Sequence, residues 1–134
     1  MKTKTLREKA AERRVKFHPL AFSNAKVYKG LNVSIRNGTK WNEKAEMGDE
    51  LLCVDLGGTP IKRVNGGAQI KSTKIISTEV FDYETYRSRI AWMISNFDHA
   101  RPTTLTTIEK TLDEVYDEDW GPEVTLVVFW IETE

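Results

Sequence analysis

The sequence predicts a single α+β domain built on a small curled sheet or barrel. Three observations lead to this fold class. Strand patterns dominate the first half of the chain, two helical patterns follow one another, and a further strand closes the sequence. Separate runs of strands and helices are typical of α+β domains. The length of 134 residues is that of one domain.

Within the basic first 17 residues, residues 5–17 read as a mostly solvated helix. His18 and Pro19 end this predicted helix, because the residue before a proline avoids the helical region. We therefore interpret residues 1–24 as a basic helical extension and residues 25–134 as the domain proper.

The first predicted strand covers residues 31–36, where apolar and polar residues alternate. A period of two argues for a strand with one buried face and one polar face. The alternation places Asn32, Ser34 and Arg36 together on the polar face.

A mostly apolar run at residues 49–56 predicts a second strand that is covered on both faces. Its Cys53 is the only cysteine of the chain and reads as a buried free thiol. A glycine-rich hairpin excursion follows. Residues 70–83 then predict a long strand with a bulge near residues 74–76, because the apolar positions change parity there.

Residues 84–97 and 103–116 carry apolar side chains at helical spacing and predict two consecutive helices. Thr106 with Glu109 offers a capping box for the second helix. The apolar run at residues 123–132 predicts a closing strand of the central type.

The net charge is zero, but the charges are unevenly distributed. Residues 1–17 hold seven Lys or Arg and two Glu, whereas residues 109–134 hold nine acids and one Lys. A basic end favours contact with phosphate groups. Charge segregation of this size is also common on protein surfaces, so a solvated surface is an equal alternative.

The chain contains no apolar run long enough for a transmembrane helix, and its first residues lack the apolar core of a secretory signal. A lone cysteine fits a reducing compartment. We therefore expect a cytoplasmic protein without membrane contact.

A basic and aromatic loop follows the first predicted strand. Arg36 offers a bidentate fork for a phosphate or a base edge, Lys40 adds affinity for phosphate, and Trp41 offers a ring for an unpaired base. Each has a structural alternative. A tryptophan next to a turn, such as Trp41, is more often a half-buried lid on the core. Arg36 is equally suited to pair with Asp49 or Glu50.

The polar strand face, this loop and a basic track in later segments together predict a binding site for a ligand or nucleic acid. Neither a metal site nor a cofactor is expected, because the two histidines lack the spacing of metal ligands. The other three tryptophans, Trp92, Trp120 and Trp130, are expected to be structural. The predicted site residues are Asn32, Ser34, Arg36, Lys40, Trp41, Arg63, Lys71 and Lys74.

The order of these features resembles the ASCH domain, a member of the PUA-like superfamily. The matching segments are "KGLNVSIRNGTKW" and "MGDELLCV", followed later by "TLTTIEKTLDEVY" and "EVTLVVFWI". The resemblance covers about residues 25–132. It implies a small PUA-like β-barrel with flanking helices, a cleft beside the strand that ends in Arg36, and binding of RNA or modified bases.

Some ASCH proteins are enzymes, and one branch looks like an amidohydrolase acting on N4-acetylated cytidine through a Lys, a Thr and a Glu. In this sequence the Thr position falls on Ser34, which keeps a hydroxyl. The Lys position falls on Leu31, with Lys29 as a displaced substitute, and the Glu position falls near Arg101. A hydroxyl needs a neighbouring base to become a nucleophile. Because the Lys and Glu positions are not matched, the comparison argues against amidohydrolase activity in this protein.

Three functions remain open from the sequence. The leading one is a non-catalytic PUA-like binding module for RNA, other single-stranded nucleic acid or a modified nucleobase. The second is a divergent nucleoside amidohydrolase or ribonuclease that uses Ser34, Lys29 and an acid such as Glu79 or Glu84. The third is a small bacterial or phage accessory protein that binds a host protein through its acidic face. Residues 1–24 are a candidate contact for a protein partner or a second copy.

Overall fold

The structure of the protein is a computed structural model. It describes residues 17–22, 27–97, 104–117 and 119–134. The helix predicted for the first 17 residues falls almost wholly outside the described residues, and so does any contact that residues 1–16 would make.

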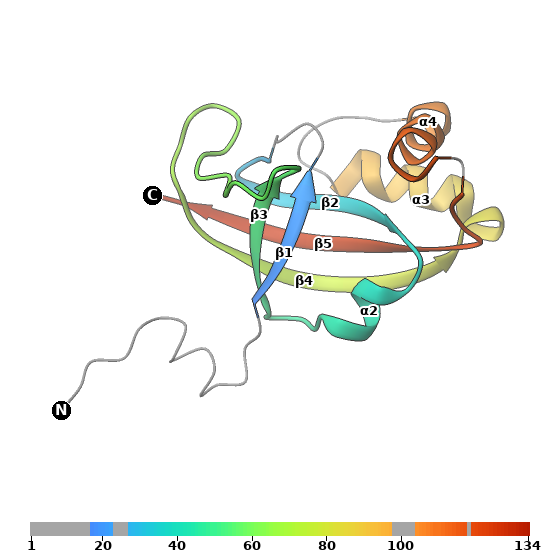
Figure 1. Cartoon of the computed structure of the whole chain (residues 1–134), viewed down its shortest axis with the longest axis horizontal. Coiled ribbons are helices and arrows are strands. Elements are labelled where there is room, and N and C mark those ends of the chain that lie inside the picture. Colours follow the sequence, from blue (N-terminus) through green and yellow to red (C-terminus); the bar gives the residue numbers. More distant parts are fainter. Residues whose placement is uncertain (1–16, 23–26, 98–103, 118) are drawn as a thin grey trace.

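The described chain forms one five-stranded mixed sheet and three helices, which confirms the predicted α+β class (Figure 1). The strand order is β1-β3-β4-β5-β2, with β1 parallel to β3 and every other neighbouring pair antiparallel. The sheet is open, with β1 and β2 at its edges, so these pairings do not close the predicted barrel. The elements in chain order are β1 (Phe17–Phe22), β2 (Gly30–Asn37), α2 (Lys40–Lys44), β3 (Glu50–Asp55), β4 (Ile70–Asp82), α3 (Tyr83–Phe97), α4 (Leu105–Tyr116) and β5 (Glu123–Thr133).

Strand β1 is not predicted by the sequence, which reads His18-Pro19 as the end of a helix. In the structure β1 pairs along its whole length with β3, from Phe17 opposite Glu50 to Phe22 opposite Asp55. Pro19 is tolerated because β1 is an edge strand, where a missing N–H group need not break the sheet ladder.

A buried contact fixes β1 to the turn that precedes β3. His18 Nε2 lies 2.9 Å from Asp49 Oδ2, and both side chains are buried. The same carboxylate oxygen accepts a hydrogen bond from the backbone N–H of Glu46, at 3.0 Å. No local sequence pattern indicates this pair, because 31 positions separate His18 from Asp49.

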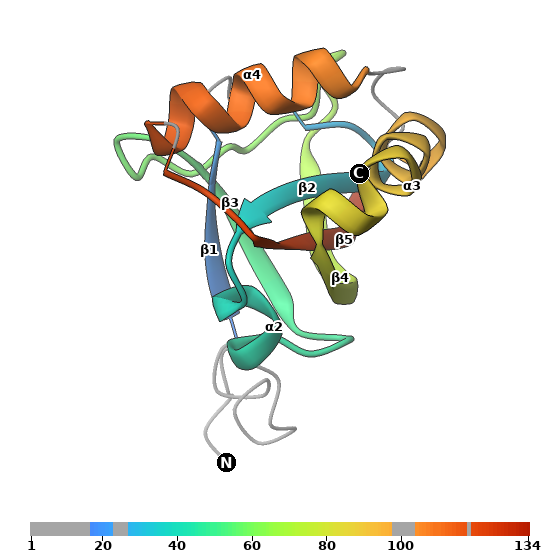
Figure 2. The ribbon, with the colours of Figure 1, turned by 90° about the vertical axis from the view of Figure 1, so that its right-hand side faces the viewer.

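The two faces of the sheet bury different apolar clusters. The outer face packs against α3 and α4, and its cluster includes Val33, Phe81, Leu126, Ile90 and Leu112. The inner face, on the other side of the curled sheet, is filled by Leu20, Leu51, Ile75, Val127 and Phe129. Figure 2 shows α4 running across the top of the strands and α3 lying to their right.

The bulge predicted for β4 is confirmed. The register between β4 and β5 shifts between Ile75 and Ser77, and a second shift falls between Ile70 and Ser72. The predicted capping box of α4 is wrong. Thr104 is the N-cap and its hydroxyl accepts a hydrogen bond from the N–H of Thr107.

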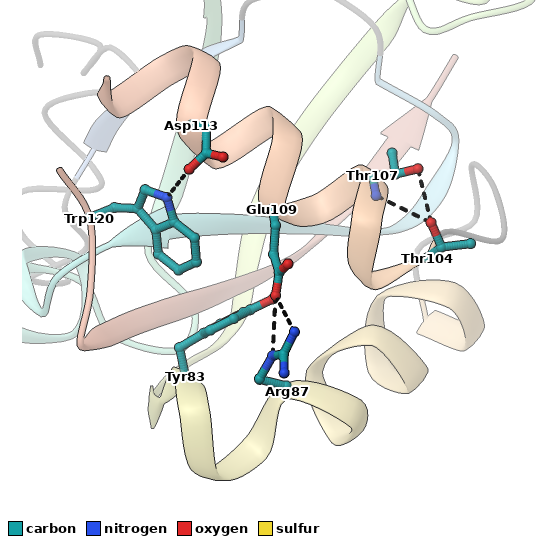
Figure 3. A network of polar contacts seen from close by, with 7 residues as sticks. All are labelled: Tyr83, Arg87, Thr104, Thr107, Glu109, Asp113 and Trp120. Atoms are coloured by element: carbon teal, nitrogen blue, oxygen red, sulfur yellow. Dashed lines mark hydrogen bonds and ion pairs between the residues drawn. The ribbon is translucent and has the colours of Figure 1, made fainter. Parts of the chain in front are cut away.

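Glu109 serves instead to join α4 to the start of α3 (Figure 3). Its Oε1 accepts hydrogen bonds from Tyr83 Oη at 3.0 Å and from Arg87 Nη2 at 2.7 Å. Further along α4, Trp120 Nε1 donates to Asp113 Oδ1 at 2.7 Å. These polar contacts fix α4 over the apolar cluster of the outer face.

Acid should weaken this connection. Hydrogen bonding from Arg87 lowers the pKa of Glu109 below its ordinary value of 4.5. A carboxyl whose pKa is depressed in the folded state stabilises the protein above its unfolded-state pKa, and this stabilisation is lost as the pH falls through the folded-state pKa. We therefore expect Glu109→Gln to lower the melting temperature at pH 7, with the difference from wild type closing towards pH 3.

Melting curves across this pH range test the prediction. Glu114→Gln, which changes an exposed glutamate of the same helix, is the matched control and should follow the wild type throughout. A difference between Glu109→Gln and wild type that does not change with pH would contradict the assignment.

None of the helices in the described part of the chain is long and apolar enough to cross a membrane.

Candidate binding site around Arg36

The polar residues of β2 point to the inner face of the sheet. Ser34 lies opposite Val127 and Arg36 lies opposite Thr125 on β5. Val127 belongs to the inner cluster, whereas the alternate β2 residue Val33 belongs to the outer one. The alternation in the sequence grouped these polar side chains correctly. It could not show that they face the interior of the curl.

The Arg36 side chain connects the two edge strands. Its Nε donates a hydrogen bond to Ser34 Oγ at 2.8 Å. Its Cζ lies 5.1 Å from the centroid of the Phe22 ring on β1, which is within the range of a cation–π contact. The guanidinium group therefore bridges the open side of the sheet, where β1 and β2 are not hydrogen-bonded to each other.

Burial lowers the pKa of Arg36 below its ordinary value, while the nearby Tyr116 and Cys53 raise it to a smaller extent. An arginine stays protonated in proteins, so the site holds a partly desolvated positive charge. No carboxylate among the described residues pairs with this charge. The Asp49 considered as its partner is hydrogen-bonded to His18 instead.

Two neighbours of Arg36 come from other elements. Cys53 of β3 is buried, which raises the pKa of its thiol to about 12. The thiol is therefore protonated at neutral pH and unreactive, as expected for a buried packing residue. Tyr116, at the end of α4, accepts a hydrogen bond through its hydroxyl from the N–H of Asn37 at 3.3 Å.

Asn32 shares the inner face, but its amide is used to build the turn before β2. Its Oδ1 accepts from the N–H of Tyr28 at 3.0 Å, and its Nδ2 donates to the carbonyl groups of Tyr28 and Gly30 at 2.7 and 3.0 Å. These contacts assign Asn32 to the support of the strand.

Trp41 and Lys40 lie on α2. Trp41 packs against the inner cluster, with its ring 5.9 Å from His18 and 4.0 Å below Lys44 Nζ. Trp41 is therefore a half-buried lid on the core, which was the structural alternative to a binding role. Its described contacts do not include Arg36, even though α2 closely follows β2 in the chain. Lys40 is exposed at the start of the helix. The contacts of Arg36 are with Ser34 and Phe22, so the three residues of the loop do not meet in one cluster.

The predicted basic track is spread over separate surfaces. Arg63 is exposed and donates to the carbonyl of Gly67 at 2.8 Å. Lys71 lines a groove of about 350 Å³ between β3 and β4. The two strands separate there because Glu50 and Lys74 form their one paired position. Lys74 lies on the outer face of the sheet.

The residues proposed for catalysis are not gathered around Ser34. Lys29 is exposed at the start of β2, and Glu84 is exposed on α3. Glu79 lies opposite Leu126, on the helix-covered face. Arg36 donates to the Ser34 hydroxyl and cannot take up its proton, so this contact does not make Ser34 a nucleophile. The described part of the chain holds no group of three metal-ligating residues.

Comparison with solved structures finds the similarity that the sequence predicts. The chain is similar to an ASCH domain from Lactobacillus crispatus JV V101, with a TM-score of 0.46, 12% identity, and coverage of 94% of this chain and 86% of that one. It is also similar to an Enterococcus faecalis V583 protein of the DUF984 family, with a TM-score of 0.44, 10% identity, and coverage of 95% and 85%. No protein-family model and no curated protein matches the sequence.

Proposed function

We propose that this protein is a binding module for RNA or a modified nucleobase, and that Arg36 holds the ligand. One observation carries the proposal. Arg36 is a partly desolvated cation on the inner face of the sheet, and no carboxylate of the described chain balances its charge. A half-buried charge without an ionised partner still carries part of the cost of desolvation, and an anionic ligand would compensate that cost.

The geometry around Arg36 suits such a ligand. Ser34 occupies Nε, which leaves the two Nη groups for a bidentate contact with a phosphate or with the acceptors of a base edge. Phe22 lies under the guanidinium plane and limits its movement. An arginine that is held in place loses less conformational entropy when it binds.

Removing the guanidinium should weaken binding. Hydrogen bonds to charged groups contribute about 1.5–3 kcal/mol each, so we expect Arg36→Ala to lower the affinity for short RNA by at least roughly tenfold. Filter binding over a range of salt concentrations measures this effect. Affinity should fall with salt, and the slope should be shallower in the variant.

Arg89→Ala is the matched control, because it removes the same charge from the exposed surface of α3. It should bind nearly as the wild type does. The proposal fails if neither RNA nor single-stranded DNA binds the wild type at low salt, or if the two arginine variants behave alike. A partner that is retained from lysate after nuclease treatment would favour the alternative of a protein-binding role.

A further inference from the structure

A second aromatic feature lies on the outer face of the sheet, away from Arg36. Trp130 of β5, which was expected to be structural, is 44% exposed. Its side chain lies on the face that carries Leu126, but outside the part that the helices cover. Its cross-strand neighbours are Lys74 on β4 and Leu31 on β2.

Two contacts fix the position of the Trp130 ring. Its Nε1 donates a hydrogen bond to Glu132 Oε1 at 3.0 Å. Its six-membered ring lies against Gly30, where a Cβ atom would stand 3.6 Å from Cη2. Gly30 also has a φ of +85°, a conformation that favours glycine. The ring is therefore held on one side and open to solvent on the other.

Two lysines neighbour the backbone positions that hold this ring. Lys74 lies directly opposite Trp130, and Lys29 precedes Gly30 in the chain; both are exposed. Glu50 is the neighbour of Lys74 on β3, but the described contacts include no ion pair between them. Both lysines are thus available to other anions.

We propose that Trp130, Lys74 and Lys29 form a stacking platform for an unpaired base of single-stranded nucleic acid. Bases of every type stack on an aromatic ring, and adjacent lysines hold the phosphates on either side. The platform rests on nucleic acid being the ligand, as proposed above, but it shares no residue with the Arg36 site.

Fluorescence anisotropy of a short labelled oligo(U) at low salt tests the platform. Trp130→Ala loses the ring on which a base would stack, so we expect this variant to bind the oligonucleotide about tenfold more weakly. Trp130→Phe, which keeps a ring, should retain most of the affinity. Trp92→Ala, which removes a more exposed tryptophan (58%) from α3, is the control and should bind as the wild type does.

The results separate the two sites. If Arg36→Ala binds weakly while Trp130→Ala binds as wild type, the platform is rejected and the proposed function stands. The reverse pattern keeps the platform and rejects Arg36 as the ligand-holding residue. Failure of the wild type to bind oligo(U) at low salt overturns both. A wild-type dimer that becomes a monomer in Trp130→Ala, measured by light scattering without oligonucleotide, would also overturn the platform by assigning this surface to self-association.

Discussion

Replacing Asp49 with alanine should destabilise the protein by about 3 kcal/mol. The Asp49 carboxylate is 5% exposed and accepts hydrogen bonds from His18 Nε2 and from the N–H of Glu46. Its removal leaves the buried His18 ring and the partly buried N–H of Glu46 without this acceptor. It also releases β1 from the turn before β3.

Urea denaturation measures this loss as a lower midpoint with an unchanged slope. Asp55→Ala is a suitable control, because the Asp55 carboxylate accepts two backbone hydrogen bonds in a solvent-exposed turn. We expect it to cost less than about 1 kcal/mol. Asp49→Asn keeps one acceptor oxygen, so its loss of stability should lie between those of Asp49→Ala and Asp55→Ala. Equal effects of Asp49→Ala and Asp55→Ala would show that the buried contact with His18 does not hold β1 in place.

Replacing Phe129 with alanine should cost about 3–5 kcal/mol, the usual range for truncating a buried phenylalanine. Phe129 is 1% exposed at the centre of the inner cluster. Small domains have roughly 5–15 kcal/mol of stability in total, so this change removes a large share of it. Phe129 also packs against Phe22, with ring centroids 6.1 Å apart, and Phe22 supports Arg36.

The variant should therefore lose affinity for RNA even at temperatures where it is still folded. Urea denaturation and filter binding on the same preparation separate the two effects. Phe129→Leu refills much of the cavity that alanine leaves, so it should recover most of the stability and most of the affinity for RNA. A loss of stability with unchanged affinity in the folded Phe129→Ala protein would show that Phe22 does not need this support to position Arg36.

Local sequence patterns predict most elements of this fold. The alternation in β2, the parity change in β4 and the helical spacing in α3 and α4 are each visible within one segment. Strand β1 is different, because it is short, contains Pro19 and pairs in parallel with β3, 33 positions further along. Nothing near His18 indicates this distant partner. The start of α4 was missed for a local reason, since several threonines compete for the N-cap position.

The candidate site could be predicted only in part. Alternation placed Ser34 and Arg36 side by side, but a period of two does not tell which face the sheet curls around. Phe22 and Tyr116 come from elements at opposite ends of the chain, so no short motif contains them with Arg36. Trp41 was grouped with Arg36 because they are close in sequence, yet α2 directs its ring towards His18. Whether a tryptophan such as Trp130 is exposed depends on where the covering helices end.

The position of β5 has a consequence for folding during synthesis. β5 lies between β4 and β2 in the sheet, although the ribosome makes it after every other described element. Until it is available, β2 has no strand to pair with, and one long edge of β4 is open. Unpaired edges of this kind are sites of aggregation. The nascent chain therefore has to keep β2 and β4 apart until β5 inserts between them, and the sheet is completed only after the last of its strands has been made.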